Sequence, residues 1–313
     1  MNIENKTFFE KNIERGIEKG ILRYSEDNKK IIYLKLGKNK EDKKYKIGDP
    51  EEKVRASYFT ELILDYGYFK NRIALELVVP KRTSKDLADI VIFDDDENKN
   101  PYIVVECKKD GVSDAEFKQA VEQVFGNANS LKANMAIVVA GTTKESFNVK
   151  DYKPLERVEN IIADIPKINK EIPKYSFIKK ENDLKIVSKD DLIKALEKSH
   201  DTIWQGGKLA PTVAFDEVSK LLFCKIKDEK DTKNGEIYKF QIGTGEKPKD
   251  VFDRVNKIYA EARKFDEEVF KEDIKLLPEI VFGVVRNIQG INFNGTDLDS
   301  KGVAFERFME DFF

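Results

Sequence analysis

Two neighbouring apolar stretches decide how this chain folds: ADIVIF at Ala88–Phe93 and IVVECK at Ile103–Lys108. Both are short runs rich in Ile and Val, a pattern typical of buried β-strands. Because residues two apart in a strand face the same side of a sheet, Glu106 and Lys108 should project together. Charged groups at the end of a buried strand cost free energy unless they have a partner or a function. If the strand with Asp89 lies alongside, three charged groups converge at one edge of the sheet.

The segments around these two stretches predict the rest of an α/β domain. Asp49 is a suitable N-cap for a helix over residues 50–66, which has proline at its first position and glycine just after its end. A third strand-like run, Ile73–Val79, follows this helix. Further on, a capping-box pattern at Ser113 opens a second amphipathic helix, and a buried strand follows at Met135–Ala140. Helix, three strands, helix and strand in this order predict a domain with a central mixed sheet.

We expect three regions along the chain: this α/β domain at residues 1–145, a connector at 146–188, and an all-α helical bundle at 189–313. The first 50 residues predict a helix at 7–19 and two polar hairpin-like segments. The connector contains several prolines and no sustained hydrophobic period. Helical spacing recurs after it, with one β-like interruption at 235–242. The expected elements are the hairpin segments 30–36 and 43–47 and the helices 191–204, 214–226, 248–265, 278–288 and one from about 300.

Composition narrows the class of protein. Charged residues make up 36% of the chain and hydrophobic ones 40%, and no apolar run approaches the roughly 20 residues of a membrane span. The N-terminus lacks the apolar core of a signal peptide, and the two cysteines, Cys107 and Cys224, lie far apart in apolar segments. We therefore expect a cytoplasmic protein that does not contact membranes. The net charge of −2 neither supports nor excludes nucleic-acid binding, because 56 basic residues could still form a basic groove.

The three charged groups suit metal-assisted cleavage of phosphodiesters. Mg²⁺ prefers hard oxygen ligands and typically takes one or two protein carboxylates, which Asp89 and Glu106 would supply, with the backbone carbonyl of Cys107 as a further ligand. The metal would lower the pKa of a bound water. Lys108 would orient that water and offset the developing negative charge.

Strand context, rather than spacing, distinguishes this pair of residues. The bare Glu-x-Lys spacing recurs in helix first turns and in a polar loop, where capping or solvation explains it. Only Glu106 and Lys108 follow a β-run that has an Asp-bearing β-run before it. The other instances are Glu51/Lys53, Glu97/Lys99 and Glu116/Lys118.

Two helical residues are candidates for supporting roles. Glu52 and Arg55 lie at the N-terminal end of the buried stripe of the first helix, so Glu52 either caps the helix or lies near the metal. Gln123 flanks the apolar stripe of the second helix. It could reach the sheet edge and hold Lys108 or a phosphate, or it is an ordinary boundary residue.

Basic residues near the two strands are candidate DNA contacts. They could bind phosphates without sequence preference, or they form a solvated loop. His200 is the only histidine, which excludes histidine-based triads and histidine-rich zinc sites, and we expect it to cap or pack a helix. The candidate contacts are Lys81, Arg82, Lys85 and Lys109.

The pattern resembles the PD-(D/E)xK nuclease superfamily, with Asp89 and the triplet Glu106-Cys107-Lys108 as its signature. It is more closely similar to the N-terminal nuclease region of type I restriction subunits and type IIG restriction-methylation enzymes, through PEEKVR at 50–55, DYGY at 65–68 and QVFG at 123–126. The resemblance implies that a helix glutamate and a downstream glutamine join the site. Asn127 departs from the family pattern, where an aromatic residue often follows that glutamine. The implied site residues are Glu52, Asp89, Glu106, Lys108 and Gln123.

The second half resembles the helical domain that precedes adenine methyltransferase domains in the same systems. HDTIW at 200–204, the stretch 214–230 and AFERF at 304–308 carry this resemblance. The chain has no glycine loop for S-adenosylmethionine, no Asn-Pro-Pro-Tyr-like motif and no phosphate-binding loop, so it should neither methylate DNA nor hydrolyse ATP alone. The resemblance implies that a methyltransferase domain, which would bind S-adenosylmethionine, follows Phe313.

The leading hypothesis is thus a magnesium-dependent restriction endonuclease fragment acting on double-stranded DNA. Its expected partners are target-recognition and methyltransferase domains or subunits, and it could dimerise on DNA. Two alternatives remain: a non-catalytic DNA-binding or interaction module on a nuclease fold, and a repair or mobile-element nuclease. A site that has lost cleavage usually loses a ligand, and the intact set of Asp89, Glu106 and Lys108 favours the first hypothesis.

Overall fold

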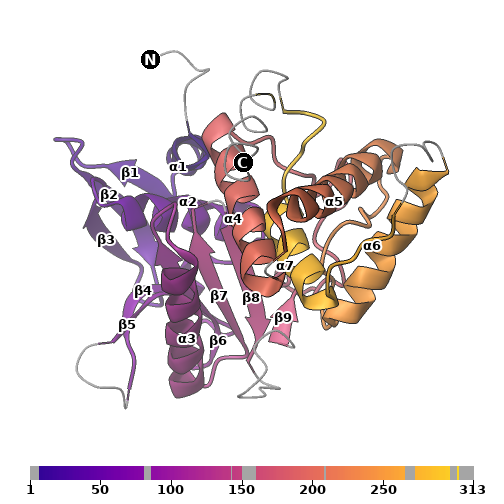
Figure 1. Cartoon of the computed structure of the whole chain (residues 1–313). Helices are drawn as coiled ribbons and strands as arrows, with labels where there is room; N and C mark the ends of the chain where they lie inside the picture. The colour runs from indigo at the N-terminus through magenta and orange to yellow at the C-terminus, as the bar shows by residue number, and fades with distance from the viewer. Residues whose placement is uncertain are drawn as a thin grey trace. The chain divides into compact units, whose positions relative to one another are not determined.

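The computed structural model of the chain describes residues 7–80, 86–141, 143–149, 160–207, 209–264, 272–296 and 302. The chain divides into two compact units, Met1–Pro173 and Lys174–Phe313, and each is described by itself (Figure 1). The first unit continues past residue 145, the predicted end of the α/β domain.

A six-stranded mixed sheet forms the centre of the first unit. Its strands lie in the order β4-β5-β6-β7-β8-β9. The neighbours β6 and β7 are parallel, and every other pair is antiparallel. The helix α3 (Asp114–Leu131) makes the crossover between the two parallel strands. This arrangement confirms the predicted α/β domain with a mixed sheet. The strands are β4 (Ile73–Val78), β5 (Leu87–Phe93), β6 (Pro101–Lys108), β7 (Met135–Ala140), β8 (Thr143–Asn148) and β9 (Ile161–Ile162).

Helices cover the two faces of this sheet and bury separate apolar cores. Alternate residues of β6 divide between the cores: Val105 packs with α1 (Phe8–Glu18) and α2 (Pro50–Leu64), whereas Val104 packs with α3. Figure 1 shows α3 running alongside β6 and β7. The face of β6 that carries Val104 also carries Glu106, so α3 covers the side of the sheet on which that carboxylate lies.

The helix caps follow the sequence pattern. The side chain of Asp49 accepts a hydrogen bond from the backbone N–H of Glu51 (3.0 Å), and Pro50 opens α2. The capping box predicted at Ser113 is present at the start of α3. The helix α2 ends at Leu64, two residues before its predicted end, and Gly67 has a left-handed backbone (φ 82°) in the turn that follows.

A small antiparallel sheet, in the order β1-β2-β3, completes the same core. Its strands are β1 (Leu22–Tyr24), β2 (Lys30–Leu36) and β3 (Glu41–Lys46). Ile31 and Tyr33 of β2 are buried in the core formed with α1, α2 and the large sheet. A one-turn helix, η2 (Lys70–Arg72), leads into β4.

Residues 160–168 also pack into the first unit. Asp164 accepts a hydrogen bond from the hydroxyl of Tyr66 (2.7 Å) and forms an ion pair with Lys144 of β8 (3.0 Å). The hydroxyl of Tyr68 donates to the carbonyl of Pro166 (2.7 Å). Part of the predicted connector therefore belongs to the packed first unit.

The described part of the second unit contains four helices and isolated β-bridges. The predicted interruption at 235–242 makes one such bridge, between Ile237 and Ile178. His200 lies on the first of these helices with its ring stacked on Trp204, centroids 6.2 Å apart. No described helix of either unit is both long enough and apolar enough to span a membrane. The helices are α4 (Lys189–Gly207), α5 (Pro211–Asp231), α6 (Pro248–Arg263) and α7 (Pro278–Ile288).

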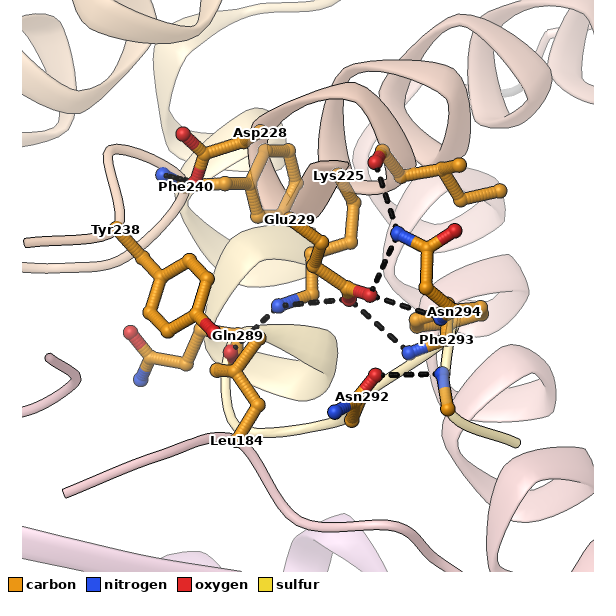
Figure 2. Close-up of polar contacts among 12 residues, drawn as sticks. Leu184, Lys225, Asp228, Glu229, Tyr238, Phe240, Gln289, Asn292, Phe293 and Asn294 are labelled. Carbon is orange, nitrogen blue, oxygen red and sulfur yellow. Dashed lines mark hydrogen bonds and ion pairs between the residues drawn. The ribbon is translucent and has the colours of Figure 1, made fainter. Parts of the chain in front are cut away.

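A buried polar network on α5 holds the segment that follows α7 (Figure 2). Glu229 accepts hydrogen bonds from the backbone N–H groups of Phe293 (3.0 Å) and Asn294 (2.8 Å). Lys225, one turn earlier, lies 3.3 Å from Glu229 and donates to the carbonyl of Gln289 (2.9 Å). Burial lowers the pKa of Lys225, and the charge of Glu229 opposes this shift. Two side chains of α5 thus fix the chain that leaves α7.

Candidate active site

Asp89, Glu106 and Lys108 come together at the junction of β5 and β6. Ile90 pairs with Val105, and Asp89 and Glu106 are the next residues on their strands. One carboxylate oxygen of Asp89 accepts a hydrogen bond from the backbone N–H of Cys107 (2.7 Å). The Nζ of Lys108 donates to Oε1 of Glu106 (2.8 Å). The structure therefore places the three charged groups at one edge of the sheet.

The carboxyl groups of Asp89 and Glu106 lie close to each other in a poorly solvated site. Burial is the main cause that raises the pKa of Glu106 to about 8, and the nearby charge of Asp89 adds to it, while Lys108 opposes it. Burial also raises the pKa of Asp89, against the hydrogen bond from Cys107 and the charge of Arg55. Because each carboxyl charge disfavours the other, an added positive charge would favour ionisation of both.

Lys108 keeps its proton in this setting. Burial by itself would lower the pKa of Lys108, but the hydrogen bond and charge of Glu106 outweigh it and raise that pKa. Its side chain is 24% exposed, whereas that of Glu106 is 3% exposed. A buried carboxylate thus lies beside a lysine whose ammonium group can reach solvent or a bound molecule.

The donor set fits a magnesium ion. Oε2 of Glu106 is buried and has no hydrogen-bond partner within the described residues, although buried carboxylate oxygens are normally satisfied. The Asp89 side chain is 27% exposed, so an ion could reach it from solvent. One or two carboxylates, with water and phosphate completing the shell, are the ligands that Mg²⁺ takes in proteins.

Glu52 and its neighbour Glu51 have different surroundings. The Glu52 side chain is 4% exposed and is held by Arg55 and by the hydroxyl of Tyr33. Glu51 is exposed, and its charge contributes to the raised pKa values of both Asp89 and Glu106. The sequence analysis did not predict Glu51 as a site residue. Both glutamates lie in the first turn of α2, and the helical period places Glu52, not Glu51, on the buried stripe.

Arg55 was not predicted as a site residue, yet it connects α2 to the site. Its guanidinium forms an ion pair with Glu52, lies 3.1 Å from Glu76 of β4, and lies 3.9 Å from Asp89. The stripe that Arg55 shares with Glu52 was visible in the sequence, but its contacts with β4 and β5 were not.

The remaining predicted residues that the structure describes lie on α3 and at the end of β6. Gln123 is half-buried on α3, on the side of the sheet that carries Glu106. Lys109 is exposed directly after β6. The backbone N–H of Cys107 donates to Asp89, and the role of its carbonyl as a metal ligand stays a prediction. The predicted DNA contacts Lys81, Arg82 and Lys85 lie outside the described residues.

Part of the chain is similar to a known protein family. Residues 50–166 match the family model for the type I restriction enzyme R protein N terminus (HSDR_N). The match begins at the first residue of α2 and extends past β9, so it contains Asp89, Glu106 and Lys108. It supports a nuclease-type region of a restriction enzyme in this part of the chain. The small sheet β1-β2-β3 and the second unit lie outside the matched residues. No curated protein matches the chain.

Proposed function

We propose that the first unit is a magnesium-dependent endonuclease that hydrolyses DNA phosphodiester bonds as the N-terminal part of a restriction-modification enzyme. The observation that carries the proposal is the buried Oε2 of Glu106, which has no hydrogen-bond partner in the described residues and lies near the carboxyl of Asp89 and the ammonium of Lys108. The family match over residues 50–166 supports the assignment to restriction enzymes.

Each residue of the site has a separate task in this proposal. Asp89 and Glu106 would hold Mg²⁺, with the carbonyl of Cys107 as a third ligand, and the bound ion would polarise the phosphate and acidify a water. Lys108 keeps its proton, so it would act as a hydrogen-bond donor that orients the water and offsets negative charge. Since the ammonium cannot accept a proton, Lys108 would not be the general base, and another group, such as the phosphate or solvent, would take the proton of the attacking water.

The proposal extends to the partners of the chain. The substrate would be double-stranded DNA, with Lys109 and the segment of Lys81, Arg82 and Lys85 contacting phosphates and Glu52 and Gln123 supporting the site. The second unit would be the helical domain that precedes a methyltransferase domain, where S-adenosylmethionine would bind. Target-recognition and methyltransferase domains or subunits would be its partners in the cytoplasm, and cutting both strands would require two copies of the site.

A cleavage assay on plasmid DNA with Mg²⁺ tests the proposal. Asp89→Asn, Glu106→Gln and Lys108→Met should each lower the cleavage rate by about 100-fold or more. The matched controls are Glu97→Gln and Lys99→Met, which have the same Glu-x-Lys spacing on exposed positions after β5 and should cut like the wild type. Cleavage that survives all three site substitutions would rule out the assignment.

Metal binding separates cleavage from the two alternatives. Calorimetry with Mn²⁺ should show binding that is lost in Asp89→Asn and Glu106→Gln and kept in Lys108→Met. Wild-type protein that binds DNA but neither binds metal nor cuts would instead be a non-catalytic DNA-binding module. A parent gene without a methyltransferase motif after Phe313 would favour a repair or mobile-element nuclease.

A further inference from the structure

The side chain of Arg55 is only 7% exposed, and it lies near three carboxylates. Its Nη2 pairs with Glu52 of the same helix. Its Nη1 lies between two residues of neighbouring strands, 3.1 Å from Glu76 Oε1 and 3.9 Å from Asp89 Oδ1. One nitrogen of a buried guanidinium is thus shared between the candidate metal ligand and a second acid on β4.

The plane of this guanidinium is fixed from several sides. The ring of Tyr45 lies under it, 4.1 Å from the guanidinium carbon to the ring centroid. Glu52 and Glu76 hold the two terminal nitrogens, and the Nε is buried without a hydrogen-bond partner in the described structure. A rigid, planar cation held in this way can fix the direction of an acid beside it, which a lysine cannot do.

Glu76 has a backbone conformation that is unusual for a residue inside a strand. Glu76 has φ 50°, a left-handed conformation that is costly for a non-glycine residue, and it lies inside the strand β4. The pairs Leu75–Ile90 and Leu77–Ala88 flank it, so Glu76 is the residue of β4 opposite Asp89. Glycine would occupy such a position without strain. The glutamate brings a carboxylate to Arg55 instead.

Asp89 is thus held by a hydrogen bond at one oxygen and faces a cation at the other. Oδ2 accepts the backbone N–H of Cys107 at 2.7 Å, and Oδ1 lies on the side of Arg55. We propose that Arg55 is a positioning residue that sets the orientation of the Asp89 carboxylate toward its metal, and that Glu76 is the anchor that fixes Arg55 for this task. This inference rests on the proposed function of the site.

The alternative is that Arg55 only neutralises Glu52 inside the core. That role needs the Glu52 contact and gives no task to Glu76 or to the strained backbone that presents it. The two roles therefore differ in what removal of the Glu76 carboxylate does. A core ion pair would be insensitive to it, whereas a positioning device would lose its anchor.

The test compares Arg55→Lys, Glu76→Gln and the double variant with Arg15→Lys in the full chain. Arg15 is a matched control because it pairs with Asp65 at 2.7 Å in the same unit, far from the site in its contacts. Calorimetry measures the Mn²⁺ dissociation constant. A second readout is the ¹³C signal of the Asp89 carboxyl in metal-free, aspartate-labelled protein, assigned with Asp89→Asn.

Arg55→Lys and Glu76→Gln should each weaken Mn²⁺ binding by roughly 10- to 100-fold, the range found when groups that orient metal ligands are removed. Both should shift the Asp89 signal, and Arg15→Lys should do neither. Because the two residues act through one contact, the double variant should be little worse than Arg55→Lys alone. If Arg55→Lys does not fold, Glu76→Gln still tests the inference, since the Glu76 side chain is 39% exposed.

Wild-type Mn²⁺ affinity in Arg55→Lys and Glu76→Gln, with an unmoved Asp89 signal, would overturn the inference. Effects that simply add in the double variant would also contradict it. A wild type that binds no Mn²⁺ would instead count against the proposed function, and the Asp89 signal of the metal-free protein would still decide whether Arg55 orients that carboxyl.

Discussion

The carboxylate of Asp89 accepts a hydrogen bond from the backbone N–H of Cys107, and Cys107 is the residue between Glu106 and Lys108. This single bond joins one candidate metal ligand on β5 to the strand that carries the other. The relative placement of Asp89 and Glu106 is therefore set by strand pairing between β5 and β6, which is more rigid than a contact between two long side chains.

The stability of the metal-free protein should depend on pH through Glu106. Its pKa in the folded state is about 8, above the usual value for glutamate, because of burial and the charge of Asp89. Between these two pKa values the folded state binds a proton that the unfolded chain has lost, so the contribution of Glu106 to stability is fully present below about pH 4.5 and is lost as pH rises toward 8. Glu106→Gln removes this dependence, and its free energy of unfolding should exceed that of the wild type increasingly over this range.

Urea unfolding without metal, between pH 5 and 9, checks this expectation. A tenfold difference in proton affinity between the folded and unfolded chain corresponds to about 1.4 kcal/mol, so a gain of several kcal/mol is the upper bound. Glu97→Gln, an exposed glutamate after β5, is the control for general effects of charge. A constant difference between Glu106→Gln and wild type at all pH values would contradict the expectation.

The adjacent residues Glu51 and Glu52 should respond differently to the same substitution. Glu52→Gln leaves the buried Arg55 short of a partner and should cost about 3 kcal/mol of unfolding free energy. Glu51→Gln should change stability by about 0.5 kcal/mol or less, because Glu51 is exposed, but it should alter Mn²⁺ affinity. Urea unfolding and calorimetry measure the two effects. Equal loss of stability in both variants would contradict the structure, in which Glu52 is buried and Glu51 is exposed.

Glu76→Gly should separate stability from metal binding. Glycine adopts the left-handed backbone of Glu76 without strain, which should stabilise the protein by about 1 to 2 kcal/mol. Glycine inside a strand also costs about 0.5 to 1 kcal/mol of stability, because it loses more conformational freedom on folding. The relief of backbone strain offsets part of the loss of the ion pair with Arg55, so the variant should lose less stability in urea than Glu52→Gln while binding Mn²⁺ more weakly. Glu61→Gly, in the regular helix α2, is the control that should only destabilise. A Glu76→Gly variant as destabilised as Glu52→Gln, with normal metal affinity, would be the contrary result.

In the second unit, Glu229→Gln should loosen the segment after α7. The carboxylate of Glu229 accepts the backbone N–H groups of Phe293 and Asn294, and hydrogen bonds to a charged group contribute about 1.5 to 3 kcal/mol. Amide hydrogen exchange at these two residues should accelerate roughly tenfold or more. Asp231→Asn, at an exposed position on the same helix, should leave their exchange unchanged. Unaltered protection in Glu229→Gln would mean that other contacts hold the segment.

Local signals in the sequence were enough for the elements that carry the site. The apolar runs around Asp89 and Glu106 formed the predicted strands, and the caps at Asp49 and Ser113 began the predicted helices. These predictions succeeded because strand alternation and capping depend on neighbours a few residues away.

The parts that sequence reasoning did not reach depend on contacts between distant segments. Arg55 lies beside Asp89 because α2 crosses over the sheet. Glu76 reaches Arg55 through its own left-handed backbone conformation, which no local sequence pattern predicts. Residues 160–168 fall in the predicted connector because β9 has two residues and no period. Their place in the first unit comes from Asp164 and its long-range partners, Tyr66 and Lys144.

The residues that match the restriction enzyme family are fewer than the residues that pack around the candidate site. The family match begins at Pro50, but Tyr33 of β2 holds Glu52, and Tyr45 of β3 lies under Arg55. A recombinant fragment trimmed to the homologous residues would lose both aromatic supports and uncover the apolar face of α2. Protein engineers who transplant the matched segment into another scaffold would have to carry the preceding residues with it, or supply another surface that covers α2.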